Sequence, residues 1–270
     1  MTAQPSWVPD GIDTSKANPA RVYDYWLGGS HNFRSDQDLA RAIIAVEPNV
    51  RNVARANRAF LDRAVRFMSQ AGVRQFIDLG SGIPTERNVH EVAQEAAAGT
   101  RVVYVDIDEV AVAHSRLLLE GNPDAAIVHA DVRDPAKILG DPATQLLIDF
   151  DQPVGLLLAS VLPFLSDGED PWRVVAEFRD AMAAGGFVAL SHGTQEAKPE
   201  VGQALEKVYN TRVAIQATFR PREEILRFFD GFSLVDPGLV YTPLWRPGPD
   251  DEVSGDPCDF WLLCGVGKKR

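Results

Sequence analysis

Short runs of consecutive apolar residues alternate with longer amphipathic stretches between residues 73 and 193. The apolar runs predict strands, and the amphipathic stretches between them predict helices. Strands that are apolar throughout are typical of a parallel sheet covered by helices on both faces. We therefore expect an α/β fold with strands at 73–82, 101–108, 125–134, 153–165 and 185–193, and with helices at 84–98, 109–120 and 171–182.

The end of the chain follows a different pattern. Two further apolar runs, 232–241 and 258–269, are separated by a link rich in proline and glycine, which favours an antiparallel pair that closes one edge of the sheet. Residues 1–72 precede the alternation and read as largely helical from about residue 35. We expect two domains: an N-terminal helical cap or lid at 1–72, and a core at 73–270 with a helical insertion at about 196–230, in which helices span 199–213 and 221–231.

Composition and charge narrow the function classes. The formal net charge is −11 and the sequence pI is about 4.9, so the surface repels phosphate backbones and a nucleic-acid platform is not expected. The longest apolar run, 155–165, is too short to span a bilayer, so no membrane partner is expected. The N-terminal residues lack the pattern of a signal peptide, and two cysteines, expected as free thiols, suit a reducing cytoplasm. The sequence does not indicate which oligomeric state the protein adopts.

Polar and small residues gather where the expected parallel strands end, and ligands of open parallel sheets bind at that edge. Glycines after the first strand allow a ligand to approach the backbone closely. A carboxylate after the second strand suits both hydroxyls of a ribose, and one after the third strand suits an exocyclic amine such as that of adenine. The residues expected in this adenosine site are Asp78, Gly80, Ser81, Gly82, Asp106, Ile107, Asp131, Val132 and Ser160.

The same segment discriminates between adenosine cofactors. A dinucleotide fingerprint needs a third glycine, whereas Thr85 stands at that position here, and Asp106 follows Gly80 by 26 residues, which is long for that motif. Asp78 is a poor neighbour for phosphate but suits a cationic ligand. These departures favour S-adenosylmethionine, although each residue alone has a structural alternative: Asp106 as a helix cap, and Asp131 as a turn residue.

The segments DLGSG, VVYVDID, HADVRDP and GGFVALSH, with the C-terminal strand pair, are similar to class I S-adenosylmethionine-dependent methyltransferases. More closely, NPARVYDYWLGGSHNFRSDQDLA, RANRAFLDRAVRFMSQAGVRQFIDLGSGIPT and FFDGFSLVDPGLV resemble an actinobacterial methyltransferase family first catalogued as a domain of unknown function. The resemblance covers nearly the whole chain. It implies a Rossmann-like, seven-stranded, mostly parallel sheet with an antiparallel last strand, and binding of S-adenosylmethionine.

The resemblance also gives a role to the early segment YDYWLGGSHNF, because segments before the first strand of such enzymes often fold over the cofactor. Aromatic faces suit a sulfonium through cation–π attraction. We expect Trp26 and Phe33 to pin the N-terminal helices to the sheet. The residues expected in a lid over the cofactor are Tyr23, Tyr25, Gly29, Ser30 and His31.

Methyl transfer needs alignment above all, and it needs a base only if the acceptor loses a proton in the same step. Candidates for a catalytic role are His192, His31 and Tyr209, with a structural role as the alternative for each. The remaining histidines lack a metal-binding spacing, so no metal is expected. The expected acceptor is a small molecule. Two other functions stay open: a non-catalytic sensor of S-adenosylmethionine or S-adenosylhomocysteine, and a nucleotide-dependent oxidoreductase.

Overall fold

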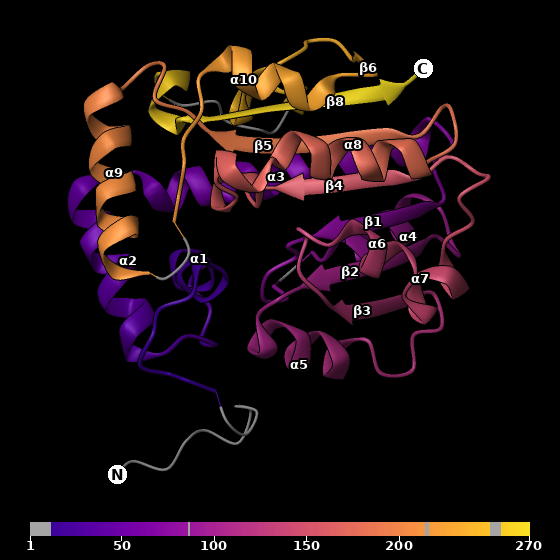
Figure 1. Cartoon of the computed structure of the whole chain (residues 1–270), viewed down its shortest axis with the longest axis horizontal. Coiled ribbons are helices and arrows are strands. Elements are labelled where there is room, and N and C mark those ends of the chain that lie inside the picture. The colour runs from indigo at the N-terminus through magenta and orange to yellow at the C-terminus, as the bar shows by residue number, and fades with distance from the viewer. Residues whose placement is uncertain (1–11, 86, 214–215, 249–254) are drawn as a thin grey trace.

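The computed structural model describes residues 12–85, 87–213, 216–248 and 255–270. Residues 1–11, on which the expectation of no signal peptide rests, lie outside the described residues. The described chain forms one mixed sheet between two layers of helices, and a further group of helices lies beyond one end of the strands (Figure 1). No helix in these ranges is both long and apolar enough to cross a bilayer.

The sheet confirms the expected mostly parallel α/β architecture. Its strand order is β3-β2-β1-β4-β5-β8-β6, and β7 also pairs with β8. The first five strands are parallel to one another, and β8 runs antiparallel to β5. The strands are β1 (Gln75–Leu79), β2 (Arg101–Asp106), β3 (Ala125–His129), β4 (Gly155–Ala159), β5 (Phe187–Gly193), β6 (Phe232–Leu234), β7 (Val240–Tyr241) and β8 (Leu262–Lys269).

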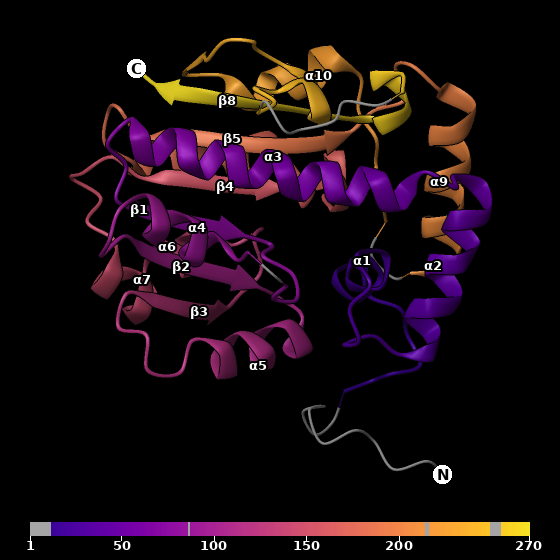
Figure 2. The same cartoon turned by 180° about the vertical axis from the view of Figure 1, so that it is seen from behind.

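Both faces of the sheet are buried, as continuous apolar strands require. On one face, Leu156 and Leu158 pack with residues of α6, α7, α8 and α10; on the other, Leu157 packs with residues of α3 and α4. Figure 2 shows α3 and α4 in front of the sheet on this second face. The helices are α1 (Pro19–Leu27), α2 (Arg34–Val46), α3 (Val50–Gln70), α4 (Val89–Ala96), α5 (Glu109–Leu118), α6 (Pro135–Leu139), α7 (Pro142–Leu147), α8 (Pro171–Ala181), α9 (Pro199–Arg212) and α10 (Arg222–Leu226).

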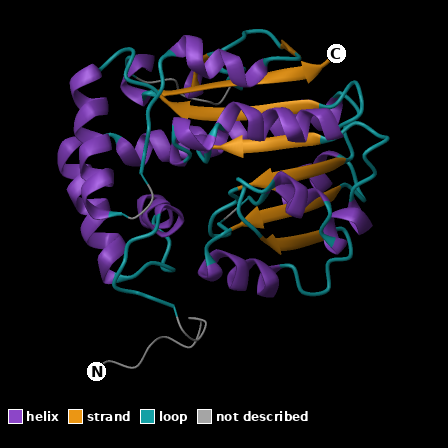
Figure 3. Cartoon of the chain, in the orientation of Figure 1, coloured by secondary structure: helices purple, strands orange, loops and turns teal. Residues whose placement is uncertain are grey.

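Helices from two distant parts of the chain meet beyond the carboxyl ends of the parallel strands. The arrowheads of β1 to β5 point toward α1, α2 and α9 (Figure 3). A shared apolar cluster joins these helices: Trp26 of α1, Ile43 of α2 and Leu205 of α9 are all buried in it. Helices α1, α2 and α9 therefore form one helical layer above the strand ends.

Several boundaries differ from those expected, each for a local reason. The helix expected from residue 84 begins at Val89, where Asn88 and Glu91 form a capping box. The expected strand 232–241 is divided by a turn in which Gly238 N donates to Val235 O, so β6 and β7 pair separately with β8 and the sheet holds eight strands rather than seven. Cys258 lies in a 3₁₀ turn before β8, not on the strand with Cys264.

Helix α3 belongs to the core rather than to a separate cap. Phe60, Ala64 and Met68 are fully buried against Phe76 of β1 and Trp245. We therefore restrict the proposed lid to α1 and α2.

Candidate functional site

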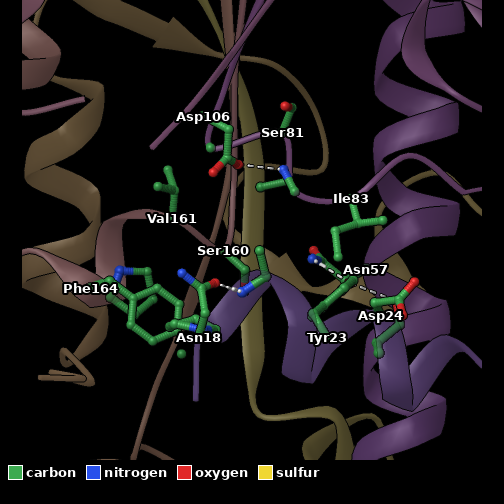
Figure 4. A pocket seen from close by; sticks show the side chains of 18 of the residues that line it. Asn18, Tyr23, Asp24, Asn57, Ser81, Ile83, Asp106, Ser160, Val161 and Phe164 are labelled. Atoms are coloured by element: carbon green, nitrogen blue, oxygen red, sulfur yellow. Dashed lines mark hydrogen bonds between the residues drawn. The ribbon is translucent and has the colours of Figure 1, made fainter. Parts of the chain in front are cut away.

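A cavity of about 190 Å³ opens at the carboxyl ends of the parallel strands, far more than the roughly 10–15 Å³ that one buried water needs (Figure 4). It lies at the reversal of strand order, since β1 pairs with β2 on one side and with β4 on the other. Two halves differ in character. The strand-end half is formed by Asp78, Gly80, Ser81, Gly82, Asp106, Ile107, Asp131 and Val132, and the aromatic half by Tyr23, Trp26, Phe164, Tyr209, Phe219 and Trp261.

The glycine turn after β1 is held against the tip of β2. Gly80 N and Ser81 N donate to Val105 O at 2.8 and 3.1 Å. Gly80 and Gly82 have φ of +68° and +69°, which favours glycine, and a Cβ on Gly80 would lie 2.4 Å from Val161. Around Gly82 no described atom lies within 4 Å of such a Cβ. The turn thus offers an open cradle for a ligand.

Asp106 ends β2 and is buried beside this turn. Its Oδ2 accepts from Gly82 N at 2.7 Å and its Oδ1 accepts from Asp108 N at 2.8 Å. Burial raises the pKa of Asp106 to about 6, against which these amide hydrogen bonds act. The helix α5 is capped by Asp108, whose side chain accepts from Val110 N and Ala111 N. Asp108, and not Asp106, is therefore the N-cap of α5, and Asp106 lines the cavity.

Asp78 is 3% exposed, and no hydrogen bond reaches its carboxylate from the described residues. Burial raises its pKa to about 7; the guanidinium of Arg58 lowers it, and the charge of Asp106 raises it further. A buried acid without donors is costly unless a ligand supplies them. Asp78 and Arg58 both line the cavity, so together they can hold a group that carries a positive and a negative charge.

The rest of the strand-end half presents one apolar and one polar wall. Ile107 is 46% exposed although it is large and apolar, and Val132 is buried; both line the cavity. Asp131 is half-buried, and Arg133 Nε donates to its Oδ1 at 2.8 Å. The carboxylate of Asp131 is thus held in place. Asp131 stabilises the turn after β3, because Arg133 N donates to its Oδ1, and it also lines the cavity.

Ser160 follows β4 with φ of +61°, an uncommon conformation for a residue that has a Cβ. Its N–H donates to Ser191 O at 3.2 Å, which fixes the turn to β5. Such strain is concentrated at functional sites. Beyond Ser160 the chain enters a 3₁₀ turn at Leu162–Phe164 and passes into the aromatic half.

Three pairs of rings line the aromatic half. Tyr23 and Trp26 lie edge to face at 6.2 Å between centroids, and Phe164 and Tyr209 do so at 5.7 Å. Phe219 and Trp261 stack at 5.4 Å. The rings come from α1, the turn after β4, α9, the segment before α10 and the residue before β8, so the compartment is assembled from the whole length of the chain.

The structure divides the residues expected in the lid. Tyr23 lines the cavity, and its hydroxyl donates to Ala54 O at 2.9 Å and accepts from Asn57 Nδ2 at 3.1 Å. Tyr25 lies under the guanidinium groups of Arg41 and Arg51. In the described lining we find neither Tyr25 nor Gly29, Ser30 and His31.

The same segment has structural roles instead. Gly29 packs so closely on Asp24 that a Cβ would overlap its carboxylate, and Asp24 Oδ2 accepts from His31 N at 2.9 Å. The His31 ring lies 3.8 Å from that of His114 on α5. Trp26 is buried mainly among the helices of the layer above the strand ends, rather than pinned directly to the sheet, and also borders the cavity, while Phe33 lies beneath the guanidinium of Arg21.

The structure does not support a role for His192 as a catalytic base. It is fully buried, its Nδ1 donates to Gly193 O at 2.8 Å, and Arg220 Nη1 donates to its Nε2 at 2.9 Å. With both nitrogens engaged, burial and the cation of Arg220 lower the ring's pKa to about 3. In the described chain the cavity reaches Gly193 but not His192. Tyr209 does line the cavity, and burial raises the pKa of its hydroxyl.

Other lining residues escaped the sequence analysis. Asn57 and Arg58 of α3 border the strand ends, and Phe164, Phe219 and Trp261 complete the aromatic half. Asn57 had a usable signal, because a polar residue interrupts the apolar stripe of α3 there. The three aromatic residues lie in loops without periodicity, so nothing local marks them.

The strand-end half fits an adenosine ligand with a cationic end better than a dinucleotide. Hydroxyl groups can meet Asp106, a flat base can cover exposed Ile107, and an ammonium can meet Asp78. A pyrophosphate needs amides at a helix N-terminus directly behind the glycine turn. Here the amides of Gly80, Ser81 and Gly82 are already bonded, and α4 begins only at Val89.

The chain is similar to a family of known proteins and to solved structures. The sequence pattern of the S-adenosyl methyltransferase family matches residues 5–270. A candidate methyltransferase from Thermobifida fusca YX is 42% identical, with a TM-score of 0.92 over 98% of this chain and 100% of that one. A DUF574 family protein from Streptomyces avermitilis MA-4680 is 34% identical, with a TM-score of 0.92 over 96% of this chain and 99% of that one.

A more distant similarity concerns the fold alone. The N-methyltransferase NodS from Bradyrhizobium japonicum WM9, solved in complex with S-adenosyl-L-homocysteine, is 11% identical, with a TM-score of 0.50 over 86% of this chain and 97% of that one. No curated protein matches the chain.

Proposed function

Because the chain belongs to the S-adenosyl methyltransferase family, we propose that the two halves of its cavity hold the two reactants of a methyl transfer. The protein is an S-adenosylmethionine-dependent methyltransferase, and S-adenosylmethionine is its cofactor. We assign the cofactor to the strand-end half and a small-molecule acceptor to the aromatic half. The observation that carries this assignment is the buried carboxylate of Asp78, which lacks a donor among the described residues, next to the carboxylate of Asp106.

Each strand-end residue has a role in this assignment. Asp106 accepts from the ribose hydroxyls, while Ile107 and Val132 enclose the adenine, and Asp131 accepts from its amine. Asp78 pairs with the ammonium of the methionine end and Arg58 with its carboxylate. Ser81 lines the same part of the cavity. In α1, Tyr23 covers the site from the lid side.

S-adenosylmethionine, when bound, supplies an electrophilic methyl group on its sulfonium. The residues of the aromatic half orient the acceptor and exclude water, and alignment of this kind lowers the barrier of a displacement by several kcal/mol. We assign no base: His192 is locked between Gly193 and Arg220, and burial keeps Tyr209 protonated. A net charge of −11 further favours a small molecule over a nucleic acid.

A sensor that binds the cofactor without turnover would use the same strand-end half. Calorimetry with S-adenosylhomocysteine and with NAD, followed by a turnover screen with radiolabelled methyl donor against metabolite extracts, separates these functions. We expect micromolar or tighter binding of S-adenosylhomocysteine, no binding of NAD, and a labelled product. Tight binding with no labelled product in any extract would favour the sensor, and binding of NAD alone would overturn the cofactor site.

We also propose a cytoplasmic location. The two cysteines are free thiols, half-buried Cys258 and buried Cys264, which suits a reducing compartment.

A further inference from the structure

The walls of the aromatic half are unusually flat and apolar for the region that must receive the second reactant. Its six rings form three contacting pairs: one within α1, one between the turn after β4 and α9, and one between the segment before α10 and the residue before β8. Leu61 and Leu262 also line the cavity. Flat apolar walls of this kind favour a planar ligand, because aromatic contacts add to the free energy of burying its surface.

Charged groups are scarce in this half. Among the described residues that line this half, Asp24 is the one Asp, Glu, Lys, Arg or His residue. Its Oδ2 already accepts hydrogen bonds from His31 N and Asn32 Nδ2. Arg58, Asp78, Asp106, Asp131 and Arg133 all belong to the strand-end half. A charged ligand in the aromatic half would therefore lose its hydration without gaining a counter-ion, which is costly.

The hydroxyls of the two lining tyrosines differ. The Tyr23 hydroxyl donates a hydrogen bond to Ala54 O and accepts one from Asn57 Nδ2. Tyr209 is 5% exposed, and within the described part of the chain its hydroxyl makes no hydrogen bond. Because Tyr209 lines the cavity and its hydroxyl has no protein partner there, a ligand that offers a hydrogen-bonding atom to this hydroxyl gains a contact that an unsubstituted hydrocarbon lacks. Burial also raises the pKa of Tyr209, which keeps the group neutral.

We propose that the aromatic half binds a planar, uncharged aromatic molecule with one hydrogen-bonding heteroatom, and that the Tyr209 hydroxyl recognises this heteroatom. The inference rests on the proposed function, which assigns the strand-end half to the cofactor and leaves this half to the acceptor. Tyr209 is then a specificity-determining residue rather than a base, and Phe164 holds its ring in place.

Three matched probes test the inference: 2-naphthol, naphthalene and 2-naphthoate, titrated by fluorescence in the presence and absence of saturating S-adenosylhomocysteine. In its presence we expect 2-naphthol to bind three- to tenfold more tightly than naphthalene and at least tenfold more tightly than 2-naphthoate. Tyr209→Phe keeps the ring and removes the hydroxyl. It should bring 2-naphthol to the affinity of naphthalene, while the affinities for naphthalene and S-adenosylhomocysteine stay unchanged. Tyr25→Phe, outside the cavity, is the matched control and should change nothing.

Other outcomes overturn the inference. Tightest binding of 2-naphthoate would show that the half takes an anion, and an undiminished preference for 2-naphthol in Tyr209→Phe would remove the role of this hydroxyl. Displacement of S-adenosylhomocysteine by 2-naphthol, or no binding of 2-naphthol at all, would also refute it. Failure of the proposed function is separate, because it appears as absent binding of S-adenosylhomocysteine, whatever the naphthalene series does.

Discussion

The two halves of the cavity are built in opposite ways. Apart from Arg58 of α3, the strand-end half comes from the ends of strands and from the turns that follow them, so short motifs such as DLGSG and VDID carry it. The aromatic half takes its six rings from five segments that lie far apart in sequence. The strand-end half is also acidic and hydrogen-bonded to backbone amides, whereas the aromatic half is apolar and has one unbonded tyrosine hydroxyl.

This difference separates what the fold provides from what the chain adds. A parallel sheet brings strand ends together in any sequence that forms it, so the first half follows from the architecture. The second half depends on how α1, α3 and α9 pack above that edge. A change in the helical layer can therefore reshape the aromatic half while the strand ends stay in place, which fits the view that function resides in sites added to common folds.

One buried residue joins the two halves. Arg21 of α1 is 4% exposed; its Nε pairs with Asp36 at 3.1 Å, and its Nη1 pairs with Asp108 at 3.3 Å. Asp108 in turn caps α5, and its N–H donates to Asp106. The helix that carries Tyr23 and Trp26 is thereby tied to the strand end that carries Asp106.

The largest effect is expected from breaking this connection. Arg21→Met leaves two buried carboxylates unpaired, and we expect the free energy of unfolding to fall by about 3–5 kcal/mol. Urea denaturation followed by circular dichroism measures it. Arg34→Met is the matched control, because the exposed pair of Arg34 with Asp38 on α2 should contribute no more than about 0.5 kcal/mol. Equal losses in the two variants would mean that the halves are not joined through Arg21.

The second prediction concerns the strand-end half alone. Asp106→Ala removes the acceptor of the ribose hydroxyls and of Gly82 N, so we expect affinity for S-adenosylhomocysteine to fall by tenfold to a hundredfold, about 1.4–2.7 kcal/mol. Calorimetry measures this loss, and circular dichroism confirms the fold. Asp131→Ala should lose less, since that carboxylate is half-exposed and already bound by Arg133. An unchanged affinity in folded Asp106→Ala would refute the ribose assignment.

The contrast between the halves explains how far sequence could predict the molecule. Alternating apolar runs predicted the parallel core and the residues that line the strand-end half of the cavity, because strand ends are local in sequence and their meeting point is fixed by topology. Tyr25 and His31 were expected in the lid since their residue types suit a sulfonium, yet helix phase decides which side chains of α1 face inward, and a turn held by Asp24 carries His31 away. Phe219 and Trp261 depend on long-range packing, which no short window contains.

The third prediction uses the raised pKa of Asp78, about 7 against an ordinary 3.8. Between about pH 4 and pH 7 the folded chain holds a proton that the unfolded chain has lost. Its contribution to stability is therefore full below pH 4 and is lost as pH rises through 7. Asp78→Asn should flatten this decline, as measured by urea denaturation across that range.

The same proton is linked to the ligand. An ammonium placed at Asp78 favours the ionised carboxylate, so binding of S-adenosylhomocysteine at pH 6 should release up to about one proton more in the wild type than in Asp78→Asn. Calorimetry in two buffers of different ionisation enthalpy counts these protons. Equal release in both proteins would place the ammonium elsewhere.

The smallest effect tests the border of the aromatic half. Tyr23 and Tyr25 lie two residues apart on α1, but only Tyr23 faces the cavity, while Arg41 and Arg51 cover the ring of Tyr25 at 5.7 Å. Tyr25→Ala removes exposed cation–π contacts, so stability should fall by no more than about 1 kcal/mol, with affinities for S-adenosylhomocysteine and 2-naphthol unchanged. Tyr23→Ala, by contrast, removes a cavity wall and the bond to Ala54 O, so it should weaken both ligands. If Tyr25→Ala weakens them as much, α1 turns its other face to the ligands and the aromatic half must be redrawn around Tyr25.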